Sequence, residues 1–466
     1  MTTTQPATID APVLNKSLRA TFDSGRTRPL AWRQQQLAGL RRMMVEADTE
    51  LTDALRQDLG RPSMEAFAAD IGHTKAELRH LAKHVARWVK PKKVRVPMTV
   101  APATGWVQPE PLGVALVIAP WNYPIQLLIE PLAAALAAGN CVLAKPSELA
   151  PACSAALARL LPRYVDPEAV IVVEGGVEET TALLGERWDH IFFTGSTAVG
   201  RVIAEAAAKH LTPTVLELGG KSPTYVHASA DLDVAARRIA WGKFFNAGQT
   251  CIAPDYVLAD RSIRDALVDK LADQLESFYG PDPKGSASFG RIVNERHLER
   301  LERLLADGAG TIVTGGVVDR GERFVAPTIT VDPRPDSPVM QEEIFGPILP
   351  VLAVDGPEEA KAFVTTRAKP LALYVFAGDD AAIDSVVDGT STGGVCINQT
   401  IMHLLPADLP FGGVGDSGMG AYHGKAGFDA FSHHKSVLRK PVKPDLKILY
   451  PPYRGSVERV FRKILR

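Results

Sequence analysis

Short apolar runs alternate with helical patterns along most of this chain, and that alternation limits what the chain can fold into. In the first half the runs occupy residues 113–119, 141–144, 170–173, 190–193 and 214–218. Helical patterns, such as residues 124–138 and 197–209, lie between them. Strands that are buried on both faces and joined by helices form parallel sheets. The alternation therefore predicts an α/β fold built on a doubly wound parallel sheet.

The same alternation starts again after Gly219 and Gly220. Helical patterns and strand-like runs follow at residues 231–245, 263–278, 295–307, 348–354, 371–376 and 394–398. A chain of 466 residues is long enough for roughly two or three domains. We therefore expect two α/β domains with a hinge near Gly219.

Charge and cysteine usage argue against several classes of protein. The formal net charge is −1, so no nucleic acid or other polyanionic partner is expected. The four cysteines are widely spaced, and no histidines stand at zinc spacing, which argues against a disulfide framework and a metal site. The N-terminus lacks a secretory signal, and the apolar segment 125–138 is broken by Glu130 and Pro131. We expect a cytoplasmic protein in which this segment is a buried helix.

One cysteine, Cys251, follows a small polar turn in residues 244–256, FFNAGQTCIAPDY. A thiol attacks as its thiolate, and a free thiol with a pKa of about 8.5 holds little thiolate at neutral pH. Backbone N–H groups at a turn or helix start would lower that pKa and could hold an oxyanion. A lone cysteine is more often a small buried apolar residue. The turn alone leaves both interpretations open.

Polar residues follow the predicted strands, where parallel sheets bind their ligands. Asn122 lies in PWNYP, just after the run 113–119. Its amide could stabilise an anion that forms during a reaction, or it could cap the next helix. Lys145 and Glu148 follow the run 141–144. They could clasp a ribose through its hydroxyls, or form a capping arrangement with a surface lysine.

The run 190–193 leads into FTGSTAVG, which contains Gly195, Ser196, Thr197, Ala198, Val199 and Gly200. Backbone N–H groups at a helix start favour a pyrophosphate. The spacing is not GxGxxG, because residue 197 is Thr, and it is not a P-loop, because Arg201 follows Gly200. The segment is either a dinucleotide site of a non-standard kind or an ordinary strand–turn–helix corner.

Glu217 lies between two leucines at the end of a predicted strand. A poorly solvated carboxylate has a raised pKa and can serve as a general base. The alternative is an ion pair between Glu217 and Lys221 at the hinge. In the second half, Glu343 and Phe345 belong to a turn with the sequence EEIFGP, and a glycine-rich loop, PFGGVG, follows later.

Together these segments resemble the aldehyde dehydrogenase superfamily. The motifs PWNYP, KPSE, FTGSTAVG, LELGGKSP, NAGQTC, EEIFGP and PFGGVGDSGMG occur in the expected order and spacing, between about residue 19 and about residue 452. The segments GGVEETTALL, AAAKHLTPT, GQTCIAPDY and AYHGKAGFDAFSHHKSV, with a late YPPY, are similar to the class 3 branch. That branch includes dimeric enzymes that act on fatty, aromatic and medium-chain aldehydes.

The resemblance implies a role for each matching residue. Cys251 matches the nucleophile, Glu217 the general base, and Asn122 the oxyanion donor that acts with the backbone N–H of Cys251. The matching cofactor residues are Gly195 to Gly200 for the dinucleotide turn, Lys145 and Glu148 for the adenosine ribose, and Glu343 and Phe345 for the nicotinamide ribose. Asn398 lies in a segment that approaches the active site. The implied cofactor is NAD, with NADP as an alternative, because Glu148 would repel a 2′-phosphate whereas Lys145 softens that repulsion.

The resemblance also implies a domain plan. A Rossmann-like NAD(P)-binding domain would comprise residues 1–91 and 112–218, and a catalytic domain residues 219–409. A small oligomerisation arm would comprise residues 92–111 and 410–445. The expected assembly is a homodimer. The basic C-terminal tail, residues 446–466, is too short to span a membrane but could lie on its surface as an amphipathic helix.

Residues and resemblance together predict oxidation of an aldehyde to the carboxylic acid. The Cys251 thiolate adds to the aldehyde, Asn122 and a backbone N–H hold the oxyanion, and hydride transfer to the nicotinamide leaves a thioester. Glu217 then activates water to release the acid. Thr197, in place of a middle glycine, fits a loosely held pyrophosphate, which would let the reduced ring withdraw and admit that water.

Three other functions fit parts of this pattern. A CoA-acylating dehydrogenase tends to lack a base at the position of Glu217, and a cysteine hydrolase without a cofactor would need a histidine base, for which His227 and His297 are nearest in sequence. A non-enzymatic binding protein on the same fold is the third. Two places depart from the class 3 pattern, Asp416 and residues 403–408, and both are expected near the substrate entrance.

Overall fold

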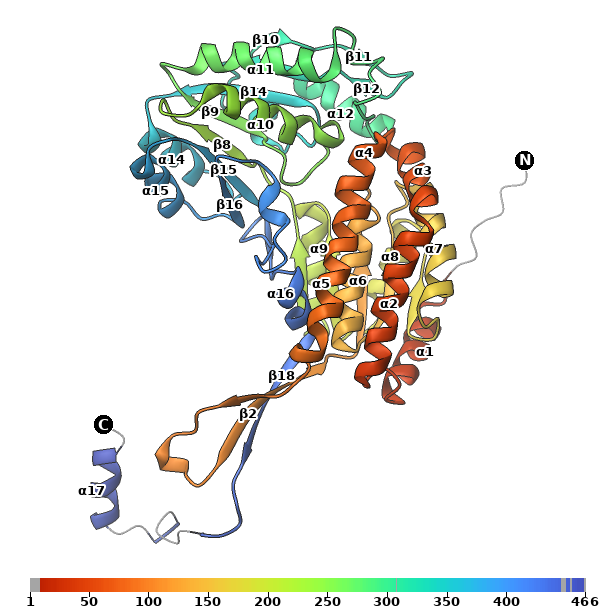
Figure 1. The fold of residues 1–466 in the computed structure, drawn as a ribbon, viewed down its shortest axis with the longest axis vertical. Helices are drawn as coiled ribbons and strands as arrows, with labels where there is room; N and C mark the ends of the chain where they lie inside the picture. The colour runs from red at the N-terminus through yellow and green to blue at the C-terminus, as the bar shows by residue number, and fades with distance from the viewer. Residues whose placement is uncertain (1–8, 307, 446–449, 453–454, 465–466) are drawn as a thin grey trace.

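The structure is a computed structural model that describes residues 9–306, 308–445, 450–452 and 455–464. Figure 1 shows two α/β bodies, one built from the N-terminal half of the chain and one from the later strands and helices. A long hairpin projects below both bodies and leads to a small helix near the C-terminus. The predicted α/β class is confirmed.

The first sheet has the strand order β17-β7-β6-β3-β4-β5. Its strands are β3 (Val114–Ile118), β4 (Cys141–Lys145), β5 (Val170–Val172), β6 (His190–Thr194), β7 (Thr214–Glu217) and β17 (Gly418–Met419). Strands β3 to β7 are parallel, whereas β17 pairs antiparallel with β7. Because β3, β4 and β6 are buried along their whole length, their sequences are the continuous apolar runs from which the sheet was predicted.

Helices cover both faces of this sheet. On one face α2 (Leu30–Glu46), α5 (His73–Trp88) and α6 (Gln126–Ala138) lie side by side (Figure 1). On the other face α1 (Ala11–Asp23) and α9 (Thr197–Ala208) pack over a separate apolar core. The remaining helices of this half are α3 (Asp48–Leu59), α4 (Ser63–Glu65), the π-helix η1 (Ala66–Gly72), α7 (Pro151–Tyr164) and α8 (Val177–Leu184).

Helix α6 is buried on every side, which explains its apolar sequence and confirms the predicted buried helix. Glu130 and Pro131 both lie inside it. Among the described residues, no helix combines the length and the apolar character that crossing a membrane requires.

The second sheet has the order β10-β13-β14-β9-β8-β15-β16, and it is parallel except for the edge strand β10. Its strands are β8 (Pro223–Val226), β9 (Tyr256–Asp260), β10 (Thr311–Thr314), β13 (Thr328–Val331), β14 (Ile348–Val354), β15 (Ala372–Phe376) and β16 (Gly394–Ile397). Its helices and turns are α10 (Leu232–Phe244), η3 (Phe245–Gly248), α11 (Arg264–Tyr279), α12 (Glu295–Ala306), α13 (Pro338–Gln341), α14 (Pro357–Thr365), α15 (Asp380–Asp388) and η4 (Met402–Leu404). A small pair, β11 (Val318–Asp319) and β12 (Phe324–Val325), stands apart from the main sheet.

The projecting hairpin belongs to a three-stranded antiparallel sheet in the order β1-β2-β18. Its strands are β1 (Lys92–Val94), β2 (Thr104–Pro111) and β18 (Ser432–Arg439), with the short η2 (Met98–Val100) before β2 and α16 (Gly424–Ala430) before β18. These strands lie in the segments assigned to the arm, although β17, from the same C-terminal segment, joins the first sheet instead. The described part of the tail contains α17 (Gly455–Ile464), so the predicted helix is present; residues 446–449, 453–454 and 465–466 of that tail lie outside the described residues.

Candidate active site

Three side chains from distant parts of the sequence meet around one cavity between the two bodies. Asn122 follows β3, Glu217 ends β7, and Cys251 follows the turn between α10 and β9. All three line a cavity of about 340 Å³. The residues to which the sequence assigned chemistry are therefore brought together, as the predicted reaction requires.

The turn before Cys251 has a left-handed backbone. Asn246, Ala247 and Gly248 have φ angles of 53°, 50° and 74°. A Cβ on Gly248 would lie 2.2 Å from the carbonyl oxygen of Gly346, so glycine is required there. The sharp turn aims the next residues back toward the strand ends.

Side-chain amides hold this turn in place. Gln249 Nε2 donates to the carbonyl oxygens of Asn246 (3.1 Å) and Arg291 (3.0 Å), and Gln249 Oε1 accepts from the N–H of Val293 at 3.0 Å. Asn246 Nδ2 donates to the carbonyl oxygens of Asn122 and Gln249, both at 3.1 Å. A buried network in which the polar groups are paired is rigid, as a site that positions a nucleophile requires.

The side chain of Asn122 points toward the same turn. Its Nδ2 donates to the Gln249 carbonyl oxygen at 3.1 Å. Helix α6 begins only at Gln126, and the N–H groups of Ile125 and Gln126 donate to Asp70 Oδ1 rather than to Asn122, so the helix-capping interpretation of Asn122 is wrong. An amide carries two N–H donors, and the second is free to serve an anion formed at Cys251 in the shared cavity.

A buried arginine joins the turn to the helical layer. Arg61 pairs with Asp70, and both side chains are fully enclosed. Arg61 also donates to the Asn122 carbonyl oxygen and, through Nε at 3.1 Å, to Asn246 Oδ1. Its guanidinium lies 4.7 Å from the centre of the Tyr123 ring. One side chain thus fixes the backbone on both sides of the site.

Arg61→Ala is expected to lower the free energy of unfolding by about 3–5 kcal/mol, because it leaves the Asp70 carboxylate buried without its charge partner. Arg56→Ala is the matched control, since Arg56 forms an exposed pair with Asp53 and its loss should cost less than about 1 kcal/mol. Urea unfolding followed by circular dichroism measures both. Equal losses in the two variants would contradict this account of the turn.

Glu217 is a buried carboxylate without a counter-charge. It is 2% exposed, and neither carboxylate oxygen has a hydrogen-bond partner among the described residues. Burial raises its pKa well above the usual value, as predicted for a general base. The alternative pairing with Lys221 is wrong, because Lys221 pairs with Asp255 and donates to the carbonyl oxygen of Glu342 at 2.8 Å.

The pKa of Cys251 differs from the expectation. Burial, and then the nearby carboxyl groups of Glu343 and Glu217, raise it to about 12, although the backbone N–H groups of Cys251 and Ile252 act in the opposite direction. The expected lowering by the turn is therefore outweighed by desolvation. At neutral pH the Cys251 side chain is therefore a thiol, and a base must take its proton before the sulfur can attack.

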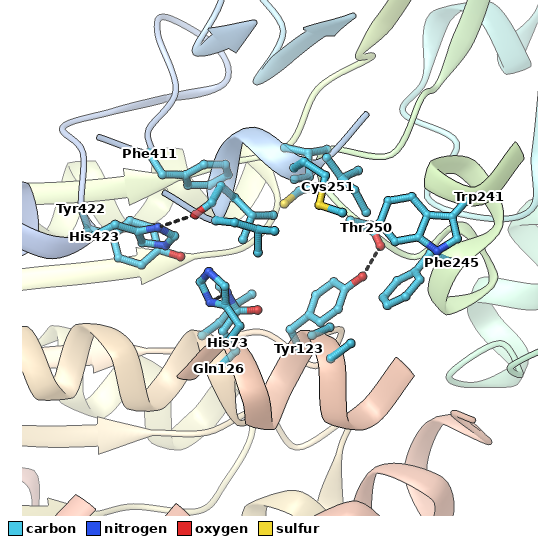
Figure 2. A pocket seen from close by; sticks show the side chains of 18 residues that line it. His73, Tyr123, Gln126, Trp241, Phe245, Thr250, Cys251, Phe411, Tyr422 and His423 are labelled. Carbon is cyan, nitrogen blue, oxygen red and sulfur yellow. Dashed lines mark hydrogen bonds between the residues drawn. The ribbon is translucent and has the colours of Figure 1, made fainter. Parts of the chain in front are cut away.

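Cys251 also lines a second cavity, of about 160 Å³, on its other side. Figure 2 shows the sulfur above Tyr123, with Trp241 and Phe245 to one side and Phe411 to the other. The lining is largely apolar, and its polar members gather at His73, Gln126 and His423. Four residues line both cavities, namely Leu127, Cys251, Phe411 and Tyr422. Cys251 therefore stands where this apolar cavity meets the larger one, here called the polar cavity because Asn122, Glu217 and Glu343 line it.

One end of the polar cavity is the predicted dinucleotide turn. Gly195 and Ser196 line it, and Thr197, Ala198 and Val199 form the first turn of α9, whose N-cap is Ser196. A Cβ on Gly200 would lie 2.6 Å from Leu218 Cδ2, so glycine lets α9 pack closely on the strand end. Close packing and a helix start that presents N–H groups are what a dinucleotide site needs.

The same cavity is also lined by Glu343 and Phe345. Burial, and then Asp255, raise the pKa of Glu343 to about 8, and its Oε1 has no hydrogen-bond partner among the described residues. A buried oxygen of this kind can accept a hydrogen bond from a ligand hydroxyl. Phe345 meets the Trp121 ring edge-on at 5.3 Å. The residues that line this cavity thus fit a nicotinamide dinucleotide.

Two other predicted contacts lie outside the lining of both cavities. Lys145 is buried at the end of β4 and pairs with Glu148 at 3.0 Å, while the first turn of α7 is capped by Asp58, so the capping interpretation with a surface lysine is wrong. Asn398 bonds the backbone of Ala377 through both amide atoms, each at 2.9 Å. Its segment reaches the apolar cavity only farther along, from Ile401 onward.

The two sequence departures lie in different places. Residues 403–408 contribute Leu404 and Leu405 to the apolar cavity, as expected for the substrate side. Asp416, in contrast, bonds Arg201 at 3.0 Å and accepts from Thr197 at the start of α9, so its expected place at the substrate entrance is wrong.

Of the two histidines considered as bases, His227 bonds Ser229 at 2.7 Å and lines neither cavity. His297 was not assigned a role, yet it lines the polar cavity with its ring 5.0 Å from that of Trp121. Burial, and then nearby arginines, lower its pKa to about 4, so it is neutral.

The aromatic lining was also missed, namely Tyr123, Trp241 and Phe245, because single aromatic residues carry no signal in sequence. Among the described residues, no group of His, Cys, Asp or Glu is arranged to hold a metal ion.

Comparison with known proteins agrees with this geometry. Residues 6–437 match the aldehyde dehydrogenase family, so the chain belongs to that family. "Aldehyde dehydrogenase, dimeric NADP-preferring" of Rattus norvegicus is 48% identical over 446 residues, which cover 95% of this chain and 98% of the relative. "Aldehyde dehydrogenase family 3 member A2" of Rattus norvegicus is 49% identical over 437 residues, covering 93% and 90%. The resemblance to the class 3 branch is confirmed.

Solved structures show the same fold. A Staphylococcus aureus AldH in a substrate-bound state is 42% identical, with a TM-score of 0.95 over 98% of this chain and 99% of that chain. An indole-3-acetaldehyde dehydrogenase in complex with NAD+ is 29% identical, with a TM-score of 0.85 over 93% and 89%. The cavities described above therefore belong to an aldehyde dehydrogenase.

Proposed function

We propose that this chain oxidises apolar aldehydes to carboxylic acids with NAD or NADP, through a thioester on Cys251. The observation that carries this proposal is the place of Cys251 at the junction of two cavities. One cavity is apolar, and the other is lined by Gly195, Ser196 and Glu343. An aldehyde carbon can reach the sulfur from one side while a hydride acceptor lies on the other.

Cys251 is the nucleophile of the first stage. Glu217, in the same cavity, accepts the thiol proton, directly or through one water, and the sulfur adds to the aldehyde carbon. The second N–H of Asn122 and the backbone N–H of Cys251 hold the oxyanion that forms. The bound nicotinamide cofactor supplies the hydride acceptor, and the carbon is left as a thioester on Cys251.

Glu217 is the base of the second stage. It takes a proton from a water that attacks the thioester carbon, the C–S bond breaks, and the acid leaves as the sulfur becomes free again. The carboxylate suits this task because it is enclosed and has no ion pair to weaken its affinity for a proton. Thr197 is the position at which we propose that the pyrophosphate is held loosely enough for the reduced ring to make room for that water.

The experiment that tests this function is a rate assay with linear and aromatic aldehydes, NAD and NADP, with and without CoA. Reduction of the cofactor with release of the free acid supports the proposal. A strict requirement for CoA would instead identify an acylating dehydrogenase, and aldehyde-independent hydrolysis of an ester would identify a cysteine hydrolase. No turnover with any aldehyde would leave a binding protein.

Cofactor preference is expected to depend on Glu148. Glu148→Gln should raise the ratio of kcat/KM with NADP to that with NAD about five- to tenfold, because it removes a negative charge next to the proposed place of the 2′-phosphate. Glu178→Gln, at an exposed position on α8, is the control and should leave the ratio unchanged. An unchanged ratio for Glu148→Gln would move the adenosine ribose away from this residue.

We further propose that the chain forms a homodimer through its arm, in the cytoplasm. Strand β18 is an edge strand of a narrow, largely exposed sheet, and edge strands pair readily with another chain. A relative whose name includes the word dimeric supports this assembly. Sedimentation equilibrium should give twice the mass of one chain.

The four cysteines are free, which suits the reducing compartment proposed for this chain. Contact between α17 and a membrane surface stays a prediction.

A further inference from the structure

One wall of the apolar cavity is a short segment with little regular structure of its own. Residues 401–405 contribute Ile401, Met402, Leu404 and Leu405 to the lining. Met402 and Leu405 are also 38% and 50% exposed, so the cavity meets the surface here. The segment contains the short turn η4, which begins after Ile401 at a φ of 49°. Such a segment needs contacts from other elements to hold one position.

One buried histidine bonds this segment directly, and a second interacts with the same residue. His423 Nδ1 lies 3.2 Å from the carbonyl oxygen of Leu404, and the Leu404 backbone also raises the pKa of His73. Figure 2 draws the bond from His423, with the His73 ring below it. Both rings line the cavity, and their centroids are 5.6 Å apart. The Leu404 carbonyl is thus bonded from the loop before α16, and α5 contributes a second imidazole ring beside it.

A carboxylate from a third element lies between the two histidines and bonds one of them, His73. Glu130, inside α6, has Oε1 2.7 Å from His73 Nδ1 and Oε2 3.3 Å from His423 Nε2. Burial opposes charge on both partners, yet the pKa of His73 is raised by Glu130 and that of Glu130 is lowered by His73, so the two form an ion pair. Burial lowers the pKa of His423 to about 4, so His423 is neutral and donates its Nδ1–H to Leu404.

This polar cluster is costly in a lining that is otherwise largely apolar. All three side chains are buried, and His423 has a φ of 74°, a left-handed conformation that is strained for a residue other than glycine. His423 Nε2 makes no hydrogen bond among the described residues. Three apolar side chains would fill the same space at a lower cost in free energy. The geometry that the cluster imposes on residues 401–405 accounts for its presence.

We propose that His73, Glu130 and His423 are positioning residues that determine which aldehydes the active site prefers. They hold residues 401–405 as the wall against which the far part of a long apolar aldehyde packs. A short aldehyde bound at Cys251 does not reach that wall. This inference rests on the proposed aldehyde oxidation.

The test compares decanal with propanal as substrates of the full-length enzyme at saturating cofactor. His73→Leu and Glu130→Gln should each lower the ratio of kcat/KM for decanal to that for propanal about tenfold, mainly by raising KM for decanal. Leu405→Ala removes part of the wall itself and should lower the ratio in the same direction. His434→Leu, at an exposed histidine paired with Asp429 on the arm, is the matched control and should leave the ratio unchanged.

An unchanged ratio in the cluster variants, or an equal loss for both aldehydes, would overturn the proposal. If His73→Leu does not fold, Glu130→Gln and Leu405→Ala decide, because the first preserves shape and the second changes a half-exposed side chain. A change that appears in kcat alone for both substrates would indicate a purely structural role and also count against the proposal. If the unmodified enzyme oxidises neither aldehyde, the proposed function itself fails, which separates the two outcomes.

Discussion

Replacing Cys251 with alanine is expected to abolish aldehyde oxidation while nucleotide binding persists. The sulfur forms the covalent bond in both stages of the proposed reaction, so kcat should fall about 10⁴-fold or more. The cofactor cavity is lined mainly by residues of other segments, such as Gly195 and Glu343, and these are untouched by the change. Initial rates followed by cofactor absorbance, and NAD titration followed by calorimetry, measure the two effects.

Cys396→Ala provides the control, because Cys396 is also partly exposed but lies on β16, outside the lining of both cavities. Its activity should stay within about threefold of the unmodified enzyme, as for substitutions away from reacting atoms. Substantial turnover in Cys251→Ala would place the chemistry on another group. Loss of NAD binding in that variant would show that the two cavities are not independent.

Replacing Glu217 with glutamine is expected to slow the second stage more than the first and so trap an acylated protein, because the thiol can also lose its proton to water whereas hydrolysis of the thioester needs the base. Without its base, water attacks the thioester slowly, and kcat should fall about 10²- to 10⁴-fold. Intact-protein mass spectrometry should then show an added mass equal to that of the aldehyde less two hydrogens. The added mass should map to the peptide that contains Cys251.

The pH dependence follows from the enclosed position of Glu217. Because burial raises its pKa, the proton-accepting form accumulates only as pH rises, so turnover of the unmodified enzyme should increase with pH above neutrality. Hydrolysis of the trapped thioester in Glu217→Gln should lack that increase. Glu205→Gln, an exposed acid on α9, should retain it. A pH profile of Glu217→Gln that matches the unmodified enzyme would assign the base to another group.

The first sheet could be predicted from sequence because its strands are buried on both faces. Strands β3, β4 and β6 read as continuous apolar runs, and the helices between them are long enough to show their periodicity. Half of the second sheet could not be found in the same way. Strands β8, β9 and β13 are short and contain threonine or tyrosine, and their burial comes from neighbouring elements rather than from their own pattern.

The residues that meet at the cavity, Asn122, Glu217 and Cys251, could be predicted because each lies in a local motif, whereas their surroundings could not. The alternative pairing of Glu217 with Lys221 rested on their nearness in sequence, whereas the fold pairs Lys221 with Asp255. The pKa of Cys251 was expected to fall, because backbone N–H groups can be inferred from a turn while the depth of burial cannot. The cluster around Glu130 is assembled from three separate elements, and nothing in the sequence links its members.

Because the two cavities share the Cys251 sulfur but few other side chains, substrate binding and cofactor binding can be altered separately by substitution. Only a few side chains, among them Phe411 and Tyr422, border both spaces in the described structure, so substitutions on opposite sides should combine additively in their effects on free energy. Substitutions that change which aldehyde the enzyme prefers need not change its affinity for NAD or NADP. An irreversible inhibitor could likewise reach Cys251 through either cavity, as an apolar electrophile or as a reactive nucleotide analogue. Its selectivity would come from the cavity whose lining differs more between related enzymes.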